Sequence, residues 1–324
     1  MASVAPTDAP GLLEASSGPS PIAWVLHDGK AGMASQALCL AEATGFPFIE
    51  KCLGIGIPWI YLPPQLWFLP FRAAGGTGAS LQPPWPDLVV ACDRNAAMPA
   101  PAIRRVGGGR IVAAQIVPEH DRARGARVIV TLGAIHRVTR ARLAAERYRF
   151  PAFAAMPRPI LSVLINGTNG ARRLTLRRVG EITEVLAGIL RRGGGSIFVT
   201  ASRWAGPTGL ALLLKRLEGL STAIWDGSGE NPYFAYHALA DAVLVSADSV
   251  SMNSEAAATG KPVHILDLDG GNAKFARFHE AMRAASTTRP FSGRIESWSY
   301  SVPDDTVRAG AALRALVLGR RKQE

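Results

Sequence analysis

Cysteine and lysine are scarce in this 324-residue chain, and the common signatures of nucleotide and metal binding are missing. Its three cysteines, Cys39, Cys52 and Cys92, are far apart and form no CxxC pair, which argues against a disulfide framework or a zinc knuckle. No Walker motif and no HExxH occurs, and no GxGxxG opens a strand-to-helix turn in the first half of the chain. Reduced thiols, as in cytoplasmic proteins, are therefore expected.

The first twenty residues lack the marks of a targeting segment. They have neither the basic start nor the apolar stretch of a signal peptide, and unlike a transit peptide they contain acids and no arginine. Their small, polar and proline-rich composition predicts a disordered tail over residues 1–20. The expected localisation is cytoplasmic, with peripheral binding to the inner membrane face as an open addition.

Charge is absent from the stretch between Cys52 and Phe71, which is about long enough to span a bilayer. Four prolines and two glycines within it argue against a continuous spanning helix. Five aromatic side chains of this stretch would suit a membrane surface: Trp59, Tyr61, Trp67, Phe68 and Phe71. Two interpretations stay open, a peripheral membrane patch and a buried loop, and a true membrane span is disfavoured.

The formal net charge of +11 is dominated by arginine and is unevenly distributed. From Arg94 to Arg149 there are twelve arginines against three acids. Such a face can meet an anionic membrane, a phosphorylated substrate or nucleic acid, or it can simply be solvated. Nucleic acid is the least favoured partner, because no aromatic platform or recognition helix accompanies the arginines.

Continuous apolar runs alternate with helix-like segments, which indicates parallel sheets covered on both faces. The expected strands of the first half are 22–27, 46–52, 87–92, 110–117 and 127–132. A proline-rich segment near 149–160 then interrupts the rhythm, and the cycle restarts. The pattern predicts an α/β protein of two Rossmann-like domains facing across a cleft. The predicted parts are residues 21–150, a linker over 151–158, and residues 159–324 with a closing C-terminal helix.

Polar residues crowd the bend that follows the buried run 243–247. A strand-to-helix turn needs one capping side chain, yet six polar residues lie within eight positions: Asp248, Ser249, Ser251, Asn253, Ser254 and Glu255. Three further polar or glycine-containing loops, at 166–170, 200–203 and 269–275, follow other expected strands. Because ligands of open α/β sheets bind at the carboxyl ends of the strands, these loops are expected to converge on one site.

The bend itself predicts a nucleotide site. A helix beginning near Val250 would offer its N-terminus to a phosphate. Glu255, about one turn into that helix, would repel a bare phosphate but could accept two hydrogen bonds from a ribose diol. The alternative is that Asp248 and the serines merely cap a helix and that Glu255 is solvated.

The chain resembles, over about residues 22 to 300, the family named for the plant "elongated mitochondria" fission protein. The segments that carry the resemblance are WVLHDGKAGMASQALCLAEATG, VLINGTNG, VTASR, GENPYFAYHALADAVLVSADSVSMNSEAAATGKPVHILDL, KFARFHEAMRAA and RPFSGRIESW. That family is in turn similar to the two-domain GT-B glycosyltransferases, which include the lipid-linked transferase of peptidoglycan synthesis. The resemblance implies a nucleotide-sugar donor site in the second domain and an acceptor site in the first.

By this resemblance, Ser249, Ser251 and Met252 fall on a diphosphate turn, Glu255 on the ribose, and Asn272 where donor-sugar contacts occur. Together the loops and the resemblance predict a donor site of Gly167, Thr168, Asn169, Ser202, Arg203, Asp248, Ser249, Ser251, Met252, Ser254, Glu255, Gly271 and Asn272. The predicted acceptor-side residues are Gly29, Lys30, Gly32, Gln36, Asp93 and Arg94.

No residue stands out as the catalytic base. An inverting transfer needs a carboxylate or a histidine near the acceptor hydroxyl, and the candidates are His27, Asp28, Asp93 and His120. His27 and Asp28, at a strand end, are preferred. Because GT-B transfer needs no bound metal, no cofactor is expected beside the nucleotide-sugar substrate. Lys30 or Arg203 would help to neutralise the leaving diphosphate.

Three functions are compatible with these residues. The first is a metal-independent GT-B glycosyltransferase that moves a sugar from a nucleotide donor to an acceptor, with a lipid-linked acceptor as one option. The second is a membrane-associated scaffold without activity, because the plant relative is associated with recruiting a dynamin-related protein partner. The third is a nucleotide-sugar epimerase, although His264 falls within a strand and is poorly available for that chemistry.

Overall fold

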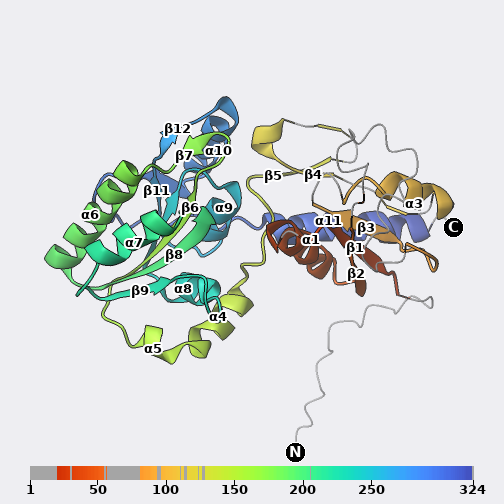
Figure 1. Cartoon of the computed structure of the whole chain (residues 1–324). Helices are drawn as coiled ribbons and strands as arrows, with labels where there is room; N and C mark the ends of the chain where they lie inside the picture. The colour runs from red at the N-terminus through yellow and green to blue at the C-terminus, as the bar shows by residue number, and fades with distance from the viewer. Residues whose placement is uncertain are drawn as a thin grey trace, which may run out of the picture.

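The computed structural model describes ten stretches of the chain, which form two α/β domains (Figure 1). The described residues are 20–29, 31–54, 56, 81–92, 96–109, 111–112, 115–122, 124–125, 128–204 and 206–322. Some sequence predictions concern residues outside these stretches, namely most of the tail, Lys30, Asp93, Arg94, and the aromatic residues Trp59, Tyr61, Trp67, Phe68 and Phe71.

The first domain is built on parallel strands. Its middle strand β1 (Ala23–His27) is buried at every residue, as expected of a continuous apolar run. β2 (Phe48–Cys52) and β3 (Leu88–Ala91) pair with β1 on either side, both in parallel. A second parallel pair is formed by β4 (Gln115–Pro118) and β5 (Val128–Thr131). All five strands match segments expected from the sequence.

The described residues between 21 and 122 include three helical segments: α1 (Ala31–Thr44), α3 (Ala100–Val106) and the short 3₁₀ turn η3 (Glu119–Asp121). α1 packs against the β1–β3 face through small and branched side chains, with Ala37, Leu40 and Ala41 all buried. The predicted acceptor-side residues Gly32 and Gln36 lie on this helix.

Six parallel strands form the sheet of the second domain, in the order β13-β11-β10-β6-β8-β9. Their bounds are β6 (Ile160–Gly167), β8 (Ser196–Trp204), β9 (Thr222–Trp225), β10 (Ala242–Ser246), β11 (Val263–Leu266) and β13 (Thr288–Pro290). The central pair β6 and β10 is buried almost throughout, because both strands are largely apolar. Parallel pairing places the carboxyl ends of β6 and β10 side by side, and the predicted donor loops follow these ends.

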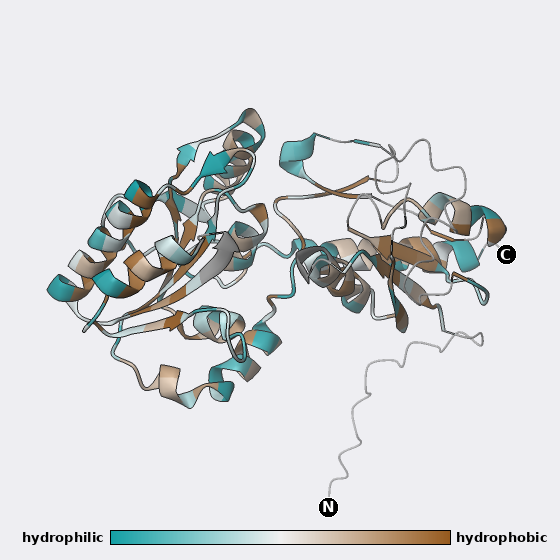
Figure 2. Cartoon of the chain, viewed as in Figure 1, coloured by the Kyte–Doolittle hydropathy of each residue, from teal (hydrophilic) through white to brown (hydrophobic). Residues whose placement is uncertain are grey.

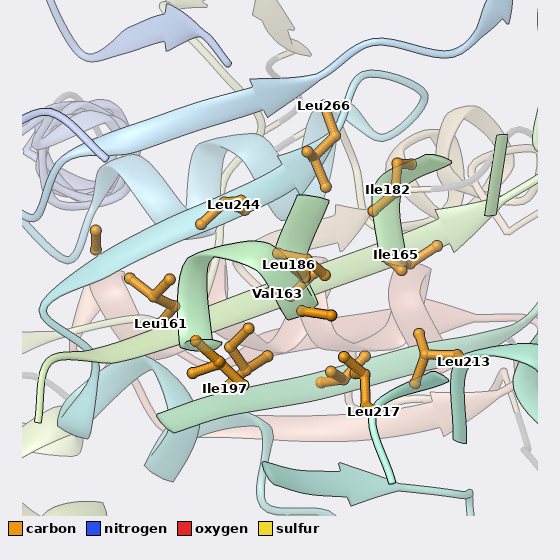
Figure 3. Packing of buried hydrophobic residues seen from close by; sticks show 14 of the residues in the cluster. Leu161, Val163, Ile165, Ile182, Leu186, Ile197, Leu213, Leu217, Leu244 and Leu266 are labelled. Atoms are coloured by element: carbon orange, nitrogen blue, oxygen red, sulfur yellow. The ribbon is translucent and has the colours of Figure 1, made fainter. Parts of the chain in front are cut away.

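Helices cover both faces of this sheet (Figure 1). They are α4 (Arg140–Arg149), α5 (Pro151–Ala154), α6 (Leu176–Gly193), α7 (Gly206–Arg216), α8 (Tyr233–Leu239), α9 (Val250–Ala257) and α10 (Ala273–Ala284). α6 buries Val179, Ile182, Leu186 and Leu190 at the three- and four-residue spacing of one helical face. Its side chains meet those of the sheet in the cluster of Figure 3.

Hydropathy follows the same layering (Figure 2). Apolar colour lies on the central strands of both domains, and hydrophilic colour on many outer turns, helix ends and the short strands β7 and β12. Among the described residues, no helix combines the length and the apolar character needed to cross a membrane.

Two helices pack in a different domain from the one to which the sequence analysis assigned them. The last helix, α11 (Asp305–Arg321), was expected to close the second domain, but it packs along α1. Its buried face, Ala309, Leu313 and Val317, joins the core of the first domain, so this part of the prediction was wrong. α4 likewise lies against α8 in the second domain, although 140–149 was assigned to the first. Pairing partners so distant in sequence leave no local signal.

The α1–α11 contact rests on a glycine. A Cβ on Gly310 would lie 2.5 Å from the Cβ and carbonyl oxygen of Ala43, whereas a Cβ on Gly319 of the same helix would meet nothing within 4 Å. We expect Gly310→Ala to lower the free energy of unfolding by about 1–3 kcal/mol through overpacking. Gly319→Ala should raise it by up to about 1 kcal/mol through helix propensity. Urea denaturation of both variants tests this, and equal effects would show that α11 does not pack closely here.

Candidate functional site

The bend between β10 and α9 is the centre of the predicted donor site. Ser249 is the N-cap of α9, and its hydroxyl accepts the N–H of Met252 at 3.2 Å. One serine therefore does the capping that a helix of this kind needs. The neighbouring polar side chains have other tasks.

Asp248 ties this bend to the loop after β6. Its side chain is only 2% exposed, and its Oδ2 accepts a hydrogen bond of 2.7 Å from the Asn166 amide. The main-chain carbonyl of Asp248 accepts a second bond of 2.7 Å from the side-chain amide of Asn169. The structure thus brings Gly167, Thr168 and Asn169 to the bend, as the sequence predicted.

Asn253 braces the bend from beneath. It is fully buried, and its amide donates to the main-chain carbonyls of Ser246 at 3.1 Å and Ser249 at 2.6 Å. These bonds hold the turn in shape without offering Asn253 to a ligand. Asn253 is one of the six polar residues that the sequence analysis found at this bend. In the structure its side chain supports the backbone of the turn.

Two donor-side serines contact the first domain. Ser254 is buried, donates to the carbonyl of Val250 at 2.8 Å and accepts the N–H of Ala134 at 2.9 Å. Both hydrogen bonds of this hydroxyl are made within the protein, and the bond from Ala134 joins the two domains. Ser251 accepts a hydrogen bond of 2.9 Å from the Gln36 amide of α1. The predicted donor side and acceptor side therefore touch directly at Gln36 and Ser251.

Glu255 has a partner that the sequence reasoning missed. The half-buried carboxylate accepts a hydrogen bond from the hydroxyl of Tyr233, the first residue of α8. Burial raises the pKa of Glu255 to about 7, and the Tyr233 hydrogen bond opposes part of that rise. Burial and the neighbouring carboxylate raise the pKa of Tyr233 well above its usual value. The signal in the sequence was the polar GENPY segment that precedes α8.

A short antiparallel strand pair joins two more of the predicted loops. β7 (Arg172–Arg173) pairs with β12 (Asp269–Gly270), so the loop after β6 lies beside the loop that leads into α10. A Cβ on Gly270, at φ +92°, would lie 2.8 Å from the carbonyl oxygen of Ala171, which restricts this position to glycine. Gly271 follows, and the exposed Asn272 caps α10 by accepting the N–H of Phe275 at 3.0 Å.

Arg172 is a second residue that the sequence reasoning did not select. Its guanidinium donates to the Asp267 carboxylate and, at 2.9 Å, to the carbonyl of Leu268. A Cβ on Gly271 would lie 3.6 Å from the same guanidinium. A cation is thus fixed beside the predicted sugar-side loop. Of the other predicted donor residues, Ser202 and Arg203 lie at the end of β8.

On the acceptor side, His27 forms a dyad with Glu50. His27 is 6% exposed at the end of β1, and its Nε2 lies 2.7 Å from Glu50 Oε1. Its Nδ1 accepts the N–H of Gly29 at 3.1 Å, so the tautomer with hydrogen on Nε2 fits both contacts. Glu50 was missed because it lies within β2, far from His27 in sequence.

The other histidines considered from the sequence are poorly placed for chemistry. His120 is buried, its ring meets Phe278 at 5.2 Å, and burial lowers its pKa. It therefore belongs to the packing between η3 and α10. His264 is fully buried within β11, and its Nε2 lies 3.3 Å from the main chain of Glu296. Within the described stretches, no group of three His, Cys, Asp or Glu side chains could hold a metal ion.

Comparison with known proteins decides the family. The family model described as "Mitochondrial fission ELM1" matches residues 31–317. The chain belongs to this family. The mitochondrial fission protein ELM1 of Arabidopsis thaliana is 34% identical to it over 199 residues, which cover 60% of this chain and 46% of the plant protein. The chain spans about half the length of the curated relatives it matches.

Solved structures that are similar to this chain include nucleotide-sugar epimerases and, at a lower score, a MurG protein. A putative UDP-N-acetylglucosamine 2-epimerase from Listeria monocytogenes has a TM-score of 0.51 at 11% identity and covers 94% of this chain and 96% of its own. MurG from Acinetobacter baumannii has a TM-score of 0.43 at 13% identity and covers 94% of both chains. The predicted ELM1 family and the predicted two-domain GT-B-like fold are both confirmed.

The Glu255–Tyr233 pair of this ELM1-family chain makes a testable prediction. Removing the hydroxyl in Tyr233→Phe takes away the hydrogen bond that favours the charged carboxylate, so the pKa of Glu255 should rise further above about 7. Carbon-detected NMR titration of the glutamate carboxyl groups would measure it. Tyr148→Phe, at an exposed tyrosine, is the control. An unchanged or lowered pKa in Tyr233→Phe would contradict the contact.

Proposed function

We propose that this chain is a GT-B-type glycosyltransferase. In this proposal it binds a nucleotide-sugar at the β10–α9 bend and transfers the sugar to an acceptor held by the first domain, without a bound metal. The observation that carries the proposal is the joining of three loops. The loop after β6 bonds to the β10–α9 bend through Asn169 and to the loop after β11 through the β7–β12 pair, and Glu255 lies one turn into α9.

Each part of the donor would meet suitable chemistry. The first-turn amides of α9 and the helix dipole favour the diphosphate. Glu255 would accept hydrogen bonds from the ribose hydroxyls, and the loop from Gly271 to Asn272 would face the sugar. The structural likeness to a protein named as a UDP-N-acetylglucosamine 2-epimerase supports a nucleotide-sugar as the ligand class. Peripheral attachment to the inner membrane face remains part of the proposal.

His27 is the proposed base. Nδ1 would exchange the N–H of Gly29 for the acceptor hydroxyl and take its proton, while the Glu50 carboxylate stabilises the imidazolium that forms. The acceptor oxygen would then attack the anomeric carbon as the bond to the nucleoside diphosphate breaks. Glu50 orients the ring and does not itself contact the acceptor.

Nucleotide binding is the first test. Calorimetric titration with UDP, GDP, CMP and their common sugar conjugates should give micromolar binding of one nucleotide, which Glu255→Gln weakens by about tenfold or more. Glu280→Gln, at an exposed glutamate of α10, is the matched control. Absence of binding by all ligands would overturn the donor site and favour the scaffold function. Inversion at C2 of the bound sugar, seen by NMR, would favour an epimerase.

Donor affinity should depend on pH through Glu255. The ribose hydroxyls donate best to the ionised carboxylate, and its pKa of about 7 leaves it mostly protonated at pH 6. Affinity for the nucleotide should therefore rise by up to about tenfold between pH 6 and pH 8. The rise should vanish in Glu255→Gln. A pH dependence that survives this substitution would assign the titration to another group.

The base assignment is tested by turnover of whichever donor binds, measured as released nucleoside diphosphate. His27→Ala should lower kcat by about 10²- to 10⁴-fold and leave nucleotide affinity unchanged. Glu50→Gln should lower kcat less, again without a change in affinity. His27 variants that keep the full rate would exclude this histidine as the base.

A further inference from the structure

The sheet of the second domain has an open edge at β9. Among the described strands, β9 pairs with β8 alone and is the last strand on its side of the sheet (Figure 1). The Ile197 N–H donates to the Ser221 carbonyl at 3.0 Å, and parallel pairing then directs the main-chain groups of Ala223 toward β8. The N–H and C=O groups of Thr222 and Ile224 therefore point away from the sheet. No hydrogen bond within the described part of the chain satisfies them.

Two hollows flank this edge. The first has a volume of about 540 Å³ and lies between β9, α5 and the start of α8. The second has a volume of about 420 Å³ and lies between β9, the end of α7 and the turn that follows it. Thr222 and Ile224 line both hollows. Because successive side chains of a strand point to opposite faces of a sheet, a strand added beside β9 would place its side chains alternately in the two hollows.

Aromatic rings line the first hollow. Phe150 and Phe153 stack with their ring centres 5.4 Å apart, and the ring of Phe153 lies 5.3 Å from that of Tyr236. Tyr236 is 1% exposed, and burial raises the pKa of its hydroxyl to about 12, so this group is a neutral O–H donor. No described residue forms a hydrogen bond with it. A ligand that covers these rings would gain by burying apolar surface, and a main-chain carbonyl could satisfy the hydroxyl.

The charge of the first hollow is opposite to that of the whole chain. The formal net charge of the chain is +11, yet the charged residues that line this hollow are Asp226 and Glu230. Glu230 pairs with Arg149. Asp226 instead accepts the hydroxyl of Ser228 at 2.6 Å and its N–H at 2.8 Å, which lowers the pKa of Asp226, and no cation with a described side chain pairs with it. A basic side chain at the carboxyl end of β9 would therefore be attracted to Asp226.

We propose that the β9 edge binds an extended segment of a partner protein as an added strand of this sheet. The segment would place an aromatic or aliphatic side chain over the ring of Phe153 and the next side chain beside the exposed Leu214 of α7. A basic residue of the segment would meet Asp226. Main-chain bonds to Thr222 and Ile224 would give affinity, and the two hollows would select the side chains.

This inference goes beyond the proposed function and does not rest on it. No residue that lines either hollow belongs to the predicted donor side, acceptor side or catalytic pair. The β9 edge would therefore bring a partner protein to the chain without blocking the bend between β10 and α9.

Selection of phage-displayed random linear peptides on the full chain tests the proposal. We expect enriched sequences in which apolar residues recur at every second position and an arginine or lysine lies at one end. The most enriched peptide, labelled with fluorescein, then serves as the probe for fluorescence polarisation. Ala152→Arg puts bulk and positive charge on the α5 wall of the first hollow, and it should weaken peptide binding by about tenfold or more. Ala154→Arg, exposed on the same helix but outside the hollow, is the matched control.

Two backbone changes identify strand addition as the binding mode. Thr222→Pro removes one outward N–H at the first residue of an edge strand, where proline is tolerated, and should also weaken binding by about tenfold. In the peptide, N-methylation at every second residue should abolish binding, because these N–H groups would point toward β9. N-methylation at the residues between them should leave the affinity within about twofold. Circular dichroism of Thr222→Pro checks that the fold is kept.

Three results would overturn the proposal. The first is a selection that enriches no sequence, and the second is peptide binding that is equal in Ala152→Arg and Ala154→Arg or equally sensitive to N-methylation at all positions. The third is a concentration-dependent dimer in sedimentation velocity that Ala152→Arg disrupts, because a second copy of this chain would then occupy the β9 edge. The nucleotide titration is read separately, so failure of the donor site leaves this test unchanged.

Discussion

A buried carboxylate holds the functional end of the second domain together. Asp248 is removed from water at the end of β10, where an uncompensated charge would be costly. Its bond to Asn166 and the bond from Asn169 to its carbonyl fasten the loop after β6 to the bend. The side-chain oxygen of Asn169 in turn accepts the N–H groups of Ala171 and Arg172, both at 2.9 Å, which shapes the loop that reaches the β7–β12 strand pair. Asp248 is therefore one of the residues that join these loops, beside Ser246, whose hydroxyl accepts the N–H of Asn166 at 3.0 Å.

A second carboxylate, that of Asp305, links the two domains by accepting hydrogen bonds from the backbone between them. Asp305, the first residue of α11, accepts the N–H groups of Leu132 at 2.8 Å and Gly133 at 3.1 Å. The segment that enters the second domain is thus clamped to the segment that returns from it. A Cβ on Gly133 would lie 2.2 Å from the Ser254 hydroxyl oxygen, so the backbone approaches α9 closely there. Together these contacts hold the two domains so that Gln36 of α1 reaches Ser251 at the predicted donor bend.

The sequence was sufficient for the strands, the two-domain architecture and the polar bend, because each leaves a local pattern. An apolar run followed by six polar residues is visible without a structure, as is a helix that starts near Val250. The pairs Glu50 with His27 and Tyr233 with Glu255 were not predictable, since each joins residues more than twenty positions apart. The packing of α11 on α1 could not be predicted from the sequence for the same reason. Ser254 was selected by its neighbours in sequence, but its hydroxyl is taken by Ala134 across the junction.

Membership of a fission family does not by itself explain the chemistry gathered at this bend. A half-buried carboxylate whose pKa lies near 7 has an energetic cost, because burial opposes its charge. Groups perturbed in this way concentrate at sites that bind or transform a ligand. The carboxylate is also oriented by a tyrosine hydroxyl rather than neutralised by a cation, which leaves it able to accept hydrogen bonds from a ligand. This arrangement suits the role proposed for Glu255, in which the carboxylate accepts hydrogen bonds from the hydroxyl groups of a neutral diol.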